Sequence, residues 1–176
     1  MDVTIRDKTF TVSIPSEKIQ ERIGELADRI TLDMKDKQPI FISILKGSLF
    51  FTSDLLKKIK MDCEVTFMRV SSYAGTQSTG YIKNLIGLSE DIQGRTVIIL
   101  EDIVDTGDTV MYLLGELKKN NPKEIKIASL LLKPNALKHK IKIDYVGFEV
   151  ANDFLIGYGL DYDGLGRNLN DIYKIV

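Results

Sequence analysis

The sequence has few of the side chains that build disulfides and soft-metal sites. It holds one cysteine, Cys63, one histidine, His139, and no tryptophan among 176 residues. A single cysteine excludes an internal disulfide framework and a multi-cysteine zinc or iron–sulfur site, and a single histidine argues against a histidine-ligated metal centre. We expect Cys63 to be a packed strand residue and His139 a solvated surface residue, because lysines flank it on both sides.

Long apolar runs are also missing. The longest, such as Val97–Leu100 and Val110–Leu114, are far shorter than the roughly 18 residues that span a bilayer. The first residues, Met1–Thr4, lack a basic stretch followed by an apolar core. We therefore expect no signal peptide, no membrane association and a cytoplasmic location.

The charges nearly cancel. Lysine and arginine number 24 against 25 acidic residues, which leaves a net charge of −1. This balance disfavours a general nucleic-acid or membrane-surface binder, which would carry a basic excess. With 44% hydrophobic residues the chain can bury a sizeable core, and its length suits one domain spanning 1–176.

Strand-like and helix-like segments alternate along the chain. Apolar residues at helical spacing follow Ser16 and Thr109, and Leu49–Lys60 also has a helical pattern. The strand-like segments are Thr9–Ile14, Ile40–Leu45, Met61–Val70, Thr96–Leu100, Glu124–Lys133 and Asp144–Val150. Such alternation predicts an α/β fold, a parallel sheet with helices on both faces. The terminal segments, about 1–15 and 150–176, are expected to form a small hood on that sheet.

The most informative segment follows the apolar strand Thr96–Leu100. Two adjacent carboxylates, Glu101 and Asp102, come at its end, where ligands of open α/β sheets bind. Adjacent carboxylates repel unless a sugar diol or a hydrated magnesium ion meets them. The alternative is that the acidic pair lies in a solvated turn without a function. The strand, the acidic pair, the turn and the next helix follow one another directly, which favours a binding site.

The stretch Asp105–Thr109 has the chemistry of a phosphate cradle. Gly107 allows a close backbone approach, Thr106 and Thr109 offer hydroxyl donors, and the following helix presents free N–H groups. An acidic pair beside a phosphate loop suggests a ligand with a diol and a phosphate, such as a ribose 5-phosphate. The segment is neither a Walker loop nor a Gly-x-Gly-x-x-Gly dinucleotide turn.

This segment closely resembles the 5-phosphoribosyl 1-pyrophosphate motif of type I phosphoribosyltransferases, and within them the hypoxanthine-guanine group. The likeness extends over about residues 5–176. Further matching segments are Leu45–Gly47, Ser72–Tyr73 with Gln77–Gly80, Lys133 after Ser129–Leu132, and Phe154–Tyr162 with Arg167. They resemble, in that order, the pyrophosphate loop, the flexible catalytic loop, the purine-selecting lysine and the C-terminal purine and pyrophosphate segment.

The resemblance implies a purine salvage enzyme, a glycosyltransferase that joins a 6-oxopurine to C1 of the activated ribose and releases pyrophosphate. Glu101 and Asp102 would face the ribose hydroxyls, directly or through Mg²⁺, and Asp161 would hold a second Mg²⁺. Asp105 would be the catalytic base at purine N7. The 5′-phosphate would lie on Thr106, Gly107, Asp108 and Thr109, with Asp108 contributing its backbone, because a carboxylate beside a phosphate is unfavourable.

The resemblance also implies the remaining contacts. Lys46, Gly47, Ser72, Tyr73 and Arg167 would meet the pyrophosphate, with Ser72 and Tyr73 closing as a lid, and the Leu45–Lys46 peptide can be cis. Lys133 would donate to the purine O6, which favours hypoxanthine and guanine over adenine, because a lysine has only donors. Phe154 would stack on the purine and Leu155 would offer its backbone. The family usually forms homodimers or homotetramers.

Three alternatives remain at this point. A regulator that kept the motif but binds nucleic acid would need a basic face. A phosphoribosyltransferase for xanthine, adenine or uracil would not need Lys133 with the Phe154–Tyr162 segment. A binding protein without catalysis would not need Asp105, Lys46 and Arg167 together.

Overall fold

The computed structural model describes residues 2–72 and 82–176. Its centre is a sheet of six strands in the order β5-β4-β3-β6-β7-β8. The strands β4, β3, β6, β7 and β8 run parallel, and β5 is an antiparallel edge. Their bounds are β3 (Ile40–Leu45), β4 (Glu64–Ser72), β5 (Ile82–Ile86), β6 (Thr96–Val104), β7 (Glu124–Leu132) and β8 (Tyr145–Glu149).

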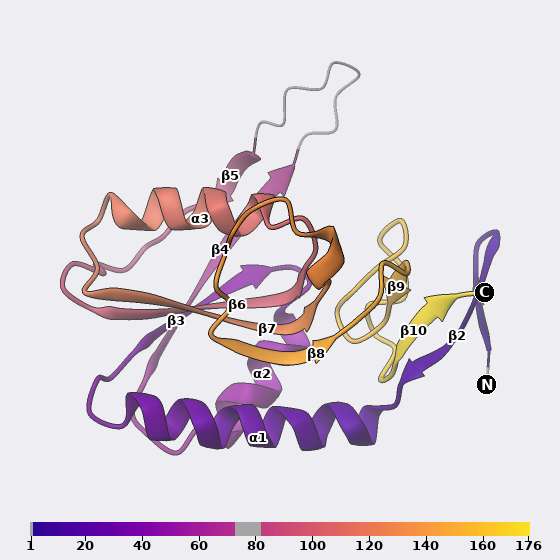
Figure 1. The fold of residues 1–176 in the computed structure, drawn as a ribbon, viewed down its shortest axis with the longest axis horizontal. Helices are drawn as coiled ribbons and strands as arrows, with labels where there is room; N and C mark the ends of the chain where they lie inside the picture. The colour runs from indigo at the N-terminus through magenta and orange to yellow at the C-terminus, as the bar shows by residue number, and fades with distance from the viewer. Residues whose placement is uncertain (1, 73–81) are drawn as a thin grey trace.

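Helices cover both faces of this sheet, as the sequence predicts (Figure 1). The helices α1 (Ser16–Met34) and α2 (Leu49–Lys58) lie on one face, and α3 (Asp108–Lys118) lies on the other. A short 3₁₀ turn, Pro134–Ala136, follows β7. In β3 the side chains alternate, so that Phe41 packs in the core beneath α1 and α2 while Ile42 packs in the core beneath α3.

The helical stripe predicted after Ser16 is confirmed. Its apolar members are fully buried along α1: Ile19, Ile23, Leu26 and Ile30. The helix begins at Ser16, whose backbone N–H donates to Oδ1 of Asp171 at 2.7 Å. A carboxylate from the far end of the chain therefore satisfies one of the free N–H groups at this helix start.

The chain termini form a second, antiparallel sheet in the order β1-β2-β10-β9. Its strands are β1 (Val3–Ile5), β2 (Lys8–Ile14), β9 (Leu155–Ile156) and β10 (Ile172–Ile175). This sheet is the hood predicted from the terminal segments, and it stands beside the C-terminal ends of the central strands (Figure 1).

Several predicted boundaries were wrong. The strand β4 begins at Glu64 rather than Met61, so Cys63, which was expected to be a packed strand residue, lies before the strand and is exposed. The helix α2 ends at Lys58 rather than Lys60. The strand β6 continues to Val104, four residues beyond the predicted end, because Glu101, Ile103 and Val104 pair with β7. Glu101 and Asp102 thus lie inside the ladder rather than after it, and backbone hydrogen bonds fix the strand that carries them.

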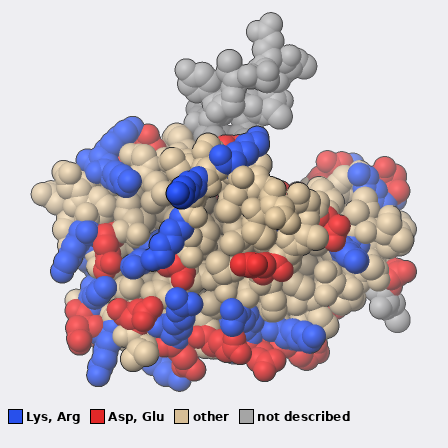
Figure 2. Space-filling view, in the orientation of Figure 1, with Lys and Arg blue, Asp and Glu red and all other residues tan. Residues whose placement is uncertain are grey.

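The surface mixes both signs of charge. Acidic and basic side chains alternate along the lower edge of the visible face, over α1, while basic ones predominate over α3 (Figure 2). Among the described residues, no helix combines the length and the apolar composition that crossing a bilayer requires.

Candidate active site

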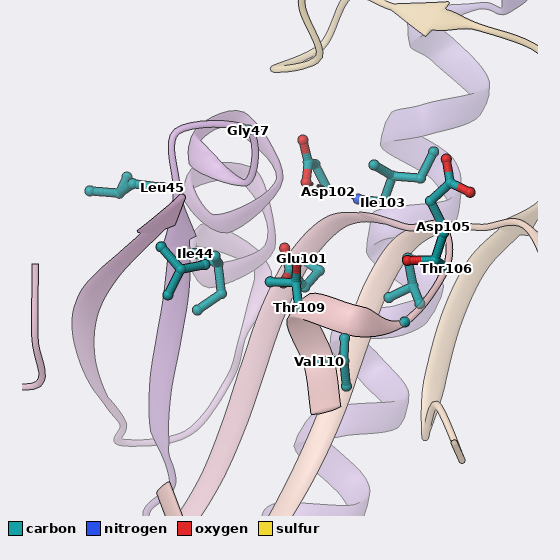
Figure 3. Close-up of a pocket in the computed structure, with 13 residues that line it drawn as sticks. Ile44, Leu45, Gly47, Glu101, Asp102, Ile103, Asp105, Thr106, Thr109 and Val110 are labelled. Atoms are coloured by element: carbon teal, nitrogen blue, oxygen red, sulfur yellow. Dashed lines mark hydrogen bonds between the residues drawn. The ribbon is translucent and has the colours of Figure 1, made fainter. Parts of the chain in front are cut away.

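A cavity of about 240 Å³ opens where β3 and β6 end and α3 begins. Most of the residues predicted to hold ribose and phosphate line it, together with apolar neighbours (Figure 3): Gly47, Glu101, Asp102, Asp105, Thr106, Gly107 and Thr109. Residues from two separate strand ends and one helix start therefore meet in one cavity, at the edge of the sheet where ligands of α/β folds bind.

Glu101 is the deepest acid of this cavity. It is 5% exposed, and its Oε1 is the single buried side-chain nitrogen or oxygen atom that lacks a hydrogen-bond partner in the described chain. Burial, and then the neighbouring charge of Asp102, raises the pKa of Glu101 well above its ordinary value. A buried acceptor without a donor is costly, so the position is suited to a ligand hydroxyl or a cation.

Asp102 lies beside the turn that follows β3. A Cβ atom on Gly47 would lie 1.7 Å from its Oδ2, so only glycine permits this approach. Burial raises the pKa of Asp102 to about 6; the backbone N–H of Ile103, 2.9 Å from Oδ1, and the charge of Arg167 oppose that rise. The peptide bond between Leu45 and Lys46 is cis.

The phosphate-cradle segment forms a tight turn into α3. Gly107 has φ +85°, and a Cβ atom there would lie 2.7 Å from Cδ1 of Ile141. Both the conformation and the close packing require glycine at this position. Thr106, Gly107 and Thr109 of this turn line the cavity, at the start of α3, where helices commonly bind anions.

Asp108 is directed to the side of this turn. Its Oδ1 lies 2.5 Å from Nε2 of His139, and its Oδ2 accepts a hydrogen bond from Thr106 Oγ1 at 2.9 Å. The prediction that His139 is only solvated surface was wrong, because its imidazole is bound to the carboxylate. No local sequence signal indicated this contact, since the two residues are 31 positions apart.

Lys133 and Asp105 form an ion pair at the ends of β7 and β6. Lys133 Nζ lies 2.8 Å from Asp105 Oδ2, and the lysine side chain is 11% exposed while the aspartate side chain is 49% exposed. The backbone N–H of Lys133 also donates to the backbone carbonyl of Val104 at 2.9 Å. A buried cation paired with an accessible carboxylate presents a donor and an acceptor side by side.

Comparisons with known proteins agree on one family. The model of the phosphoribosyl transferase domain matches residues 15–163. The hypoxanthine-guanine phosphoribosyltransferase of Bacillus subtilis is 44% identical over 159 residues, 90% of this chain and 88% of that protein. The Mycobacterium tuberculosis enzyme of the same name is 40% identical over 169 residues, 92% of this chain and 84% of that protein.

Solved structures match as well. A Bacillus anthracis hypoxanthine-guanine phosphoribosyltransferase has a TM-score of 0.89 at 37% identity, over 94% of this chain and 98% of that one. A Staphylococcus aureus hypoxanthine phosphoribosyltransferase has a TM-score of 0.90 at 39% identity, over 94% and 91%. The chain belongs to the phosphoribosyltransferase family. The fold and the family resemblance predicted from the sequence are therefore confirmed.

The phosphoribosyltransferase has a second cavity of about 360 Å³ that adjoins the first at Leu45. Lys46 and Arg167, the two basic residues among the predicted pyrophosphate contacts, both line it. Arg167 is held by two partners, with Nη2 2.5 Å from Asp161 Oδ1 and Nη1 2.6 Å from the carbonyl of Gly159. The arginine and the predicted Mg²⁺ ligand Asp161 are thus in direct contact.

The hood of the phosphoribosyltransferase carries the predicted purine residues. Leu155 is buried, while Phe154 is 44% exposed and packs one side of its ring near Phe10 and Tyr162, at centroid distances of 6.3 and 5.8 Å. Lys8 lies 5.8 Å from the centroid of the Phe154 ring. The ring is therefore partly packed and partly free.

The hood is also fixed to α2 by a network that the sequence reasoning missed. Tyr158 Oη donates to Asp54 Oδ2 at 2.6 Å, and Gln20 Nε2 donates to the same oxygen at 2.6 Å. A Cβ atom on Gly159 would lie 2.0 Å from the carbonyl oxygen of Gly47. The hood thus touches the backbone of the predicted pyrophosphate loop.

The two residues predicted to form the lid fall at a gap in the described chain. Tyr73 lies outside the described residues, and so does the side chain of Ser72, the last residue of β4. In the described chain, no three histidine, cysteine or acidic side chains converge closely enough to hold a metal by themselves. Mg²⁺ needs no such cage, because it commonly binds one or two carboxylates together with water and substrate phosphates.

Proposed function

We propose that this phosphoribosyltransferase transfers the phosphoribosyl group of 5-phosphoribosyl 1-pyrophosphate to hypoxanthine and guanine, giving the nucleoside monophosphate and pyrophosphate. The observation that carries this choice of base is the Lys133–Asp105 pair, with its nitrogen and oxygen 2.8 Å apart. The O6 and N7–H of a 6-oxopurine lie on one edge of the ring. That edge offers an acceptor for Lys133 and a donor for Asp105.

The same pair argues against adenine. Lysine has only donors, and the 6-amino group of adenine offers another donor. If adenine were bound, the nearly buried ammonium of Lys133 would lose the Asp105 carboxylate to the base and gain no acceptor. It would then be left unpaired, which costs free energy. We infer that Asp105 then accepts the N7 proton as the glycosidic bond forms.

The sugar and its leaving group would lie along the two cavities. Glu101 and Asp102 would hold the ribose hydroxyls, and Thr106, Gly107 and Thr109 would bind the 5′-phosphate. Lys46 and Arg167 would bind the pyrophosphate, whose negative charge grows as it leaves. This order along the site follows the order of the cavities, which adjoin at Leu45.

We propose Mg²⁺ as the cofactor. The unpartnered Oε1 of Glu101 and the raised pKa of Asp102 indicate carboxylates that lack a positive partner, and oxygen ligands suit this ion. Glu101, Asp102 and Asp161 would hold it, directly or through water. The ion would neutralise charge on the pyrophosphate.

We propose that the protein is a homodimer or a tetramer built from such dimers. Large apolar side chains are exposed on β4 and at the start of α2: Val65 and Phe67 are 43% and 40% exposed, and Leu49 is 49% exposed. Val65 and Phe67 alternate with buried Thr66 and Met68, so they face away from the α3 core. A second copy is the occupant that we expect on this face.

The test of the activity is one assay with four bases. Purified protein with Mg²⁺ and 5-phosphoribosyl 1-pyrophosphate is given hypoxanthine, guanine, xanthine or adenine, and pyrophosphate release is measured. We expect turnover with hypoxanthine and guanine and little with adenine. Lys133→Ala should reduce kcat/KM for 6-oxopurines selectively, and an unchanged base preference in this variant would contradict its role. No turnover with hypoxanthine or guanine would overturn the assignment.

A further inference from the structure

Asp108 poses an electrostatic problem at the proposed 5′-phosphate site. It is the first residue of α3 and lies between Gly107 and Thr109, both of which line the cavity. Hydrogen bonds from His139 and Thr106 lower the pKa of Asp108, so the carboxylate is charged at neutral pH. A fixed negative charge in this position repels a phosphate unless a cation offsets it.

The connection between β7 and β8 supplies that cation. The imidazole Nε2 of His139 lies 2.5 Å from Asp108 Oδ1, and Lys138 Nζ lies 3.8 Å from Oδ2. The His139 side chain is 36% exposed, against 66% for Lys138, so the histidine is the more buried and the closer partner. The lysine is at ion-pair distance but beyond hydrogen-bond range.

One hydrogen bond and two close approaches place this connection against the phosphate turn. The backbone N–H of Lys138 donates to the carbonyl of Thr106 at 2.9 Å. A Cβ atom on Gly107 would lie 2.7 Å from Ile141 Cδ1 and 3.7 Å from His139 Cδ2. His139 is therefore held against the turn by backbone and apolar packing as well as by the charge of Asp108.

We propose that His139 is a positioning residue for the phosphoribosyl substrate: in its protonated form it cancels the charge of Asp108 and holds that carboxylate away from the 5′-phosphate. This inference rests on the proposed placement of the 5′-phosphate on Thr106–Thr109.

Several other charged groups lie near the turn, and their partners or exposure can be named. Asp105 is paired with Lys133, and Lys142 is paired with Asp144 at 3.4 Å. Lys138 and Lys140, on either side of His139, are exposed. Among these neighbours, the histidine is the group in hydrogen-bond contact with the Asp108 carboxylate.

The test measures KM for 5-phosphoribosyl 1-pyrophosphate and kcat. His139→Gln should raise KM about fivefold, the size of one screened charge contact. The values of kcat and of KM for hypoxanthine should change little.

A double mutant isolates the charge pair. Asp108→Asn removes the carboxylate, so adding His139→Gln to it should cause no further rise in KM. Glu116→Gln, which removes an exposed carboxylate from the same helix α3, controls for general loss of surface charge. Equal penalties of His139→Gln with and without Asp108 would overturn the proposal.

A separate variant tests the site beneath the proposal. Thr109→Val removes a hydroxyl that faces the cavity and should raise KM for 5-phosphoribosyl 1-pyrophosphate at every pH. If Thr109→Val raises KM while His139→Gln does not, the role of His139 is wrong and the placement of the phosphate stands. If Thr109→Val leaves KM unchanged in an active enzyme, the placement is wrong and the role of His139 falls with it.

Discussion

At the residue scale, Glu101 shows how a buried acid favours ligand binding over stability. Its pKa is raised by burial and by Asp102, so its charged form is disfavoured in the folded protein. A carboxyl group whose pKa is raised by folding does not change the free energy of unfolding at low pH, where it is protonated in both the folded and the unfolded protein. It lowers the free energy of unfolding increasingly as pH rises above its unfolded value, about 4.3.

Glu101→Gln should therefore stabilise the substrate-free protein more at pH 8 than at pH 5. The same change should raise KM for 5-phosphoribosyl 1-pyrophosphate, because the amide cannot serve as the carboxylate does. Urea unfolding at the two pH values and steady-state kinetics measure both effects. An equal gain in stability at both pH values would show that the charge of Glu101 is not its cause.

Asp105 carries the proposed proton transfer. Asp105→Asn keeps the shape of the side chain but cannot accept the N7 proton, so kcat should fall by about 100-fold. Affinity for the nucleoside monophosphate should change far less. The exposed Asp36→Asn, in the connection between α1 and β3, serves as the control. Equal losses in kcat and in nucleotide affinity would indicate a binding role instead.

At the scale of elements, the contact between the hood and the turn after β3 positions the two halves of the proposed pyrophosphate site. Gly159 has φ +102°, and its missing side chain leaves room for the carbonyl of Gly47. The same hood segment carries Asp161, and Tyr158 fixes it to α2 through Asp54. This backbone contact therefore places the hood directly against the turn.

Gly159→Ala should lower the free energy of unfolding by at least about 2 kcal/mol and raise KM for 5-phosphoribosyl 1-pyrophosphate. The matched control is Gly94→Ala, at φ +69° with no atom within 4 Å of the new Cβ. That variant suffers backbone strain alone, about 1 kcal/mol. Thermal unfolding and kinetics separate the two. Similar KM values in both variants would show that the contact with Gly47 does not position the site.

At the scale of the whole molecule, the exposed apolar side chains of β4 predict self-association. Phe67→Lys places a charge on this face and should convert the assembly to monomers, as measured by analytical ultracentrifugation. Val176→Lys, at an apolar residue that is 81% exposed in the hood, is the control and should leave the assembly unchanged. A wild-type protein that is monomeric at micromolar concentration would contradict the proposal.

The sequence by itself determined the α/β layout, because apolar periodicity and turn residues act over short stretches of chain. The stripe from Ile19 to Ile30 and the run Val97–Leu100 are buried as predicted. It also determined which segments carry chemistry, since Glu101–Thr109 is one continuous motif. Boundaries such as the end of β6 were missed because pairing with β7, rather than local preference, extends that strand.

Only the tertiary structure decided which of these side chains meet. Lys133 and Asp105 are 28 positions apart, and His139 and Asp108 are 31 apart, yet each pair is in contact. Such contacts depend on strand order and on how the β7–β8 connection packs, which no local pattern encodes. The fold therefore sorts the charges of a near-neutral sequence into pairs, and one of these pairs, Lys133 with Asp105, lies at the edge of the cavity.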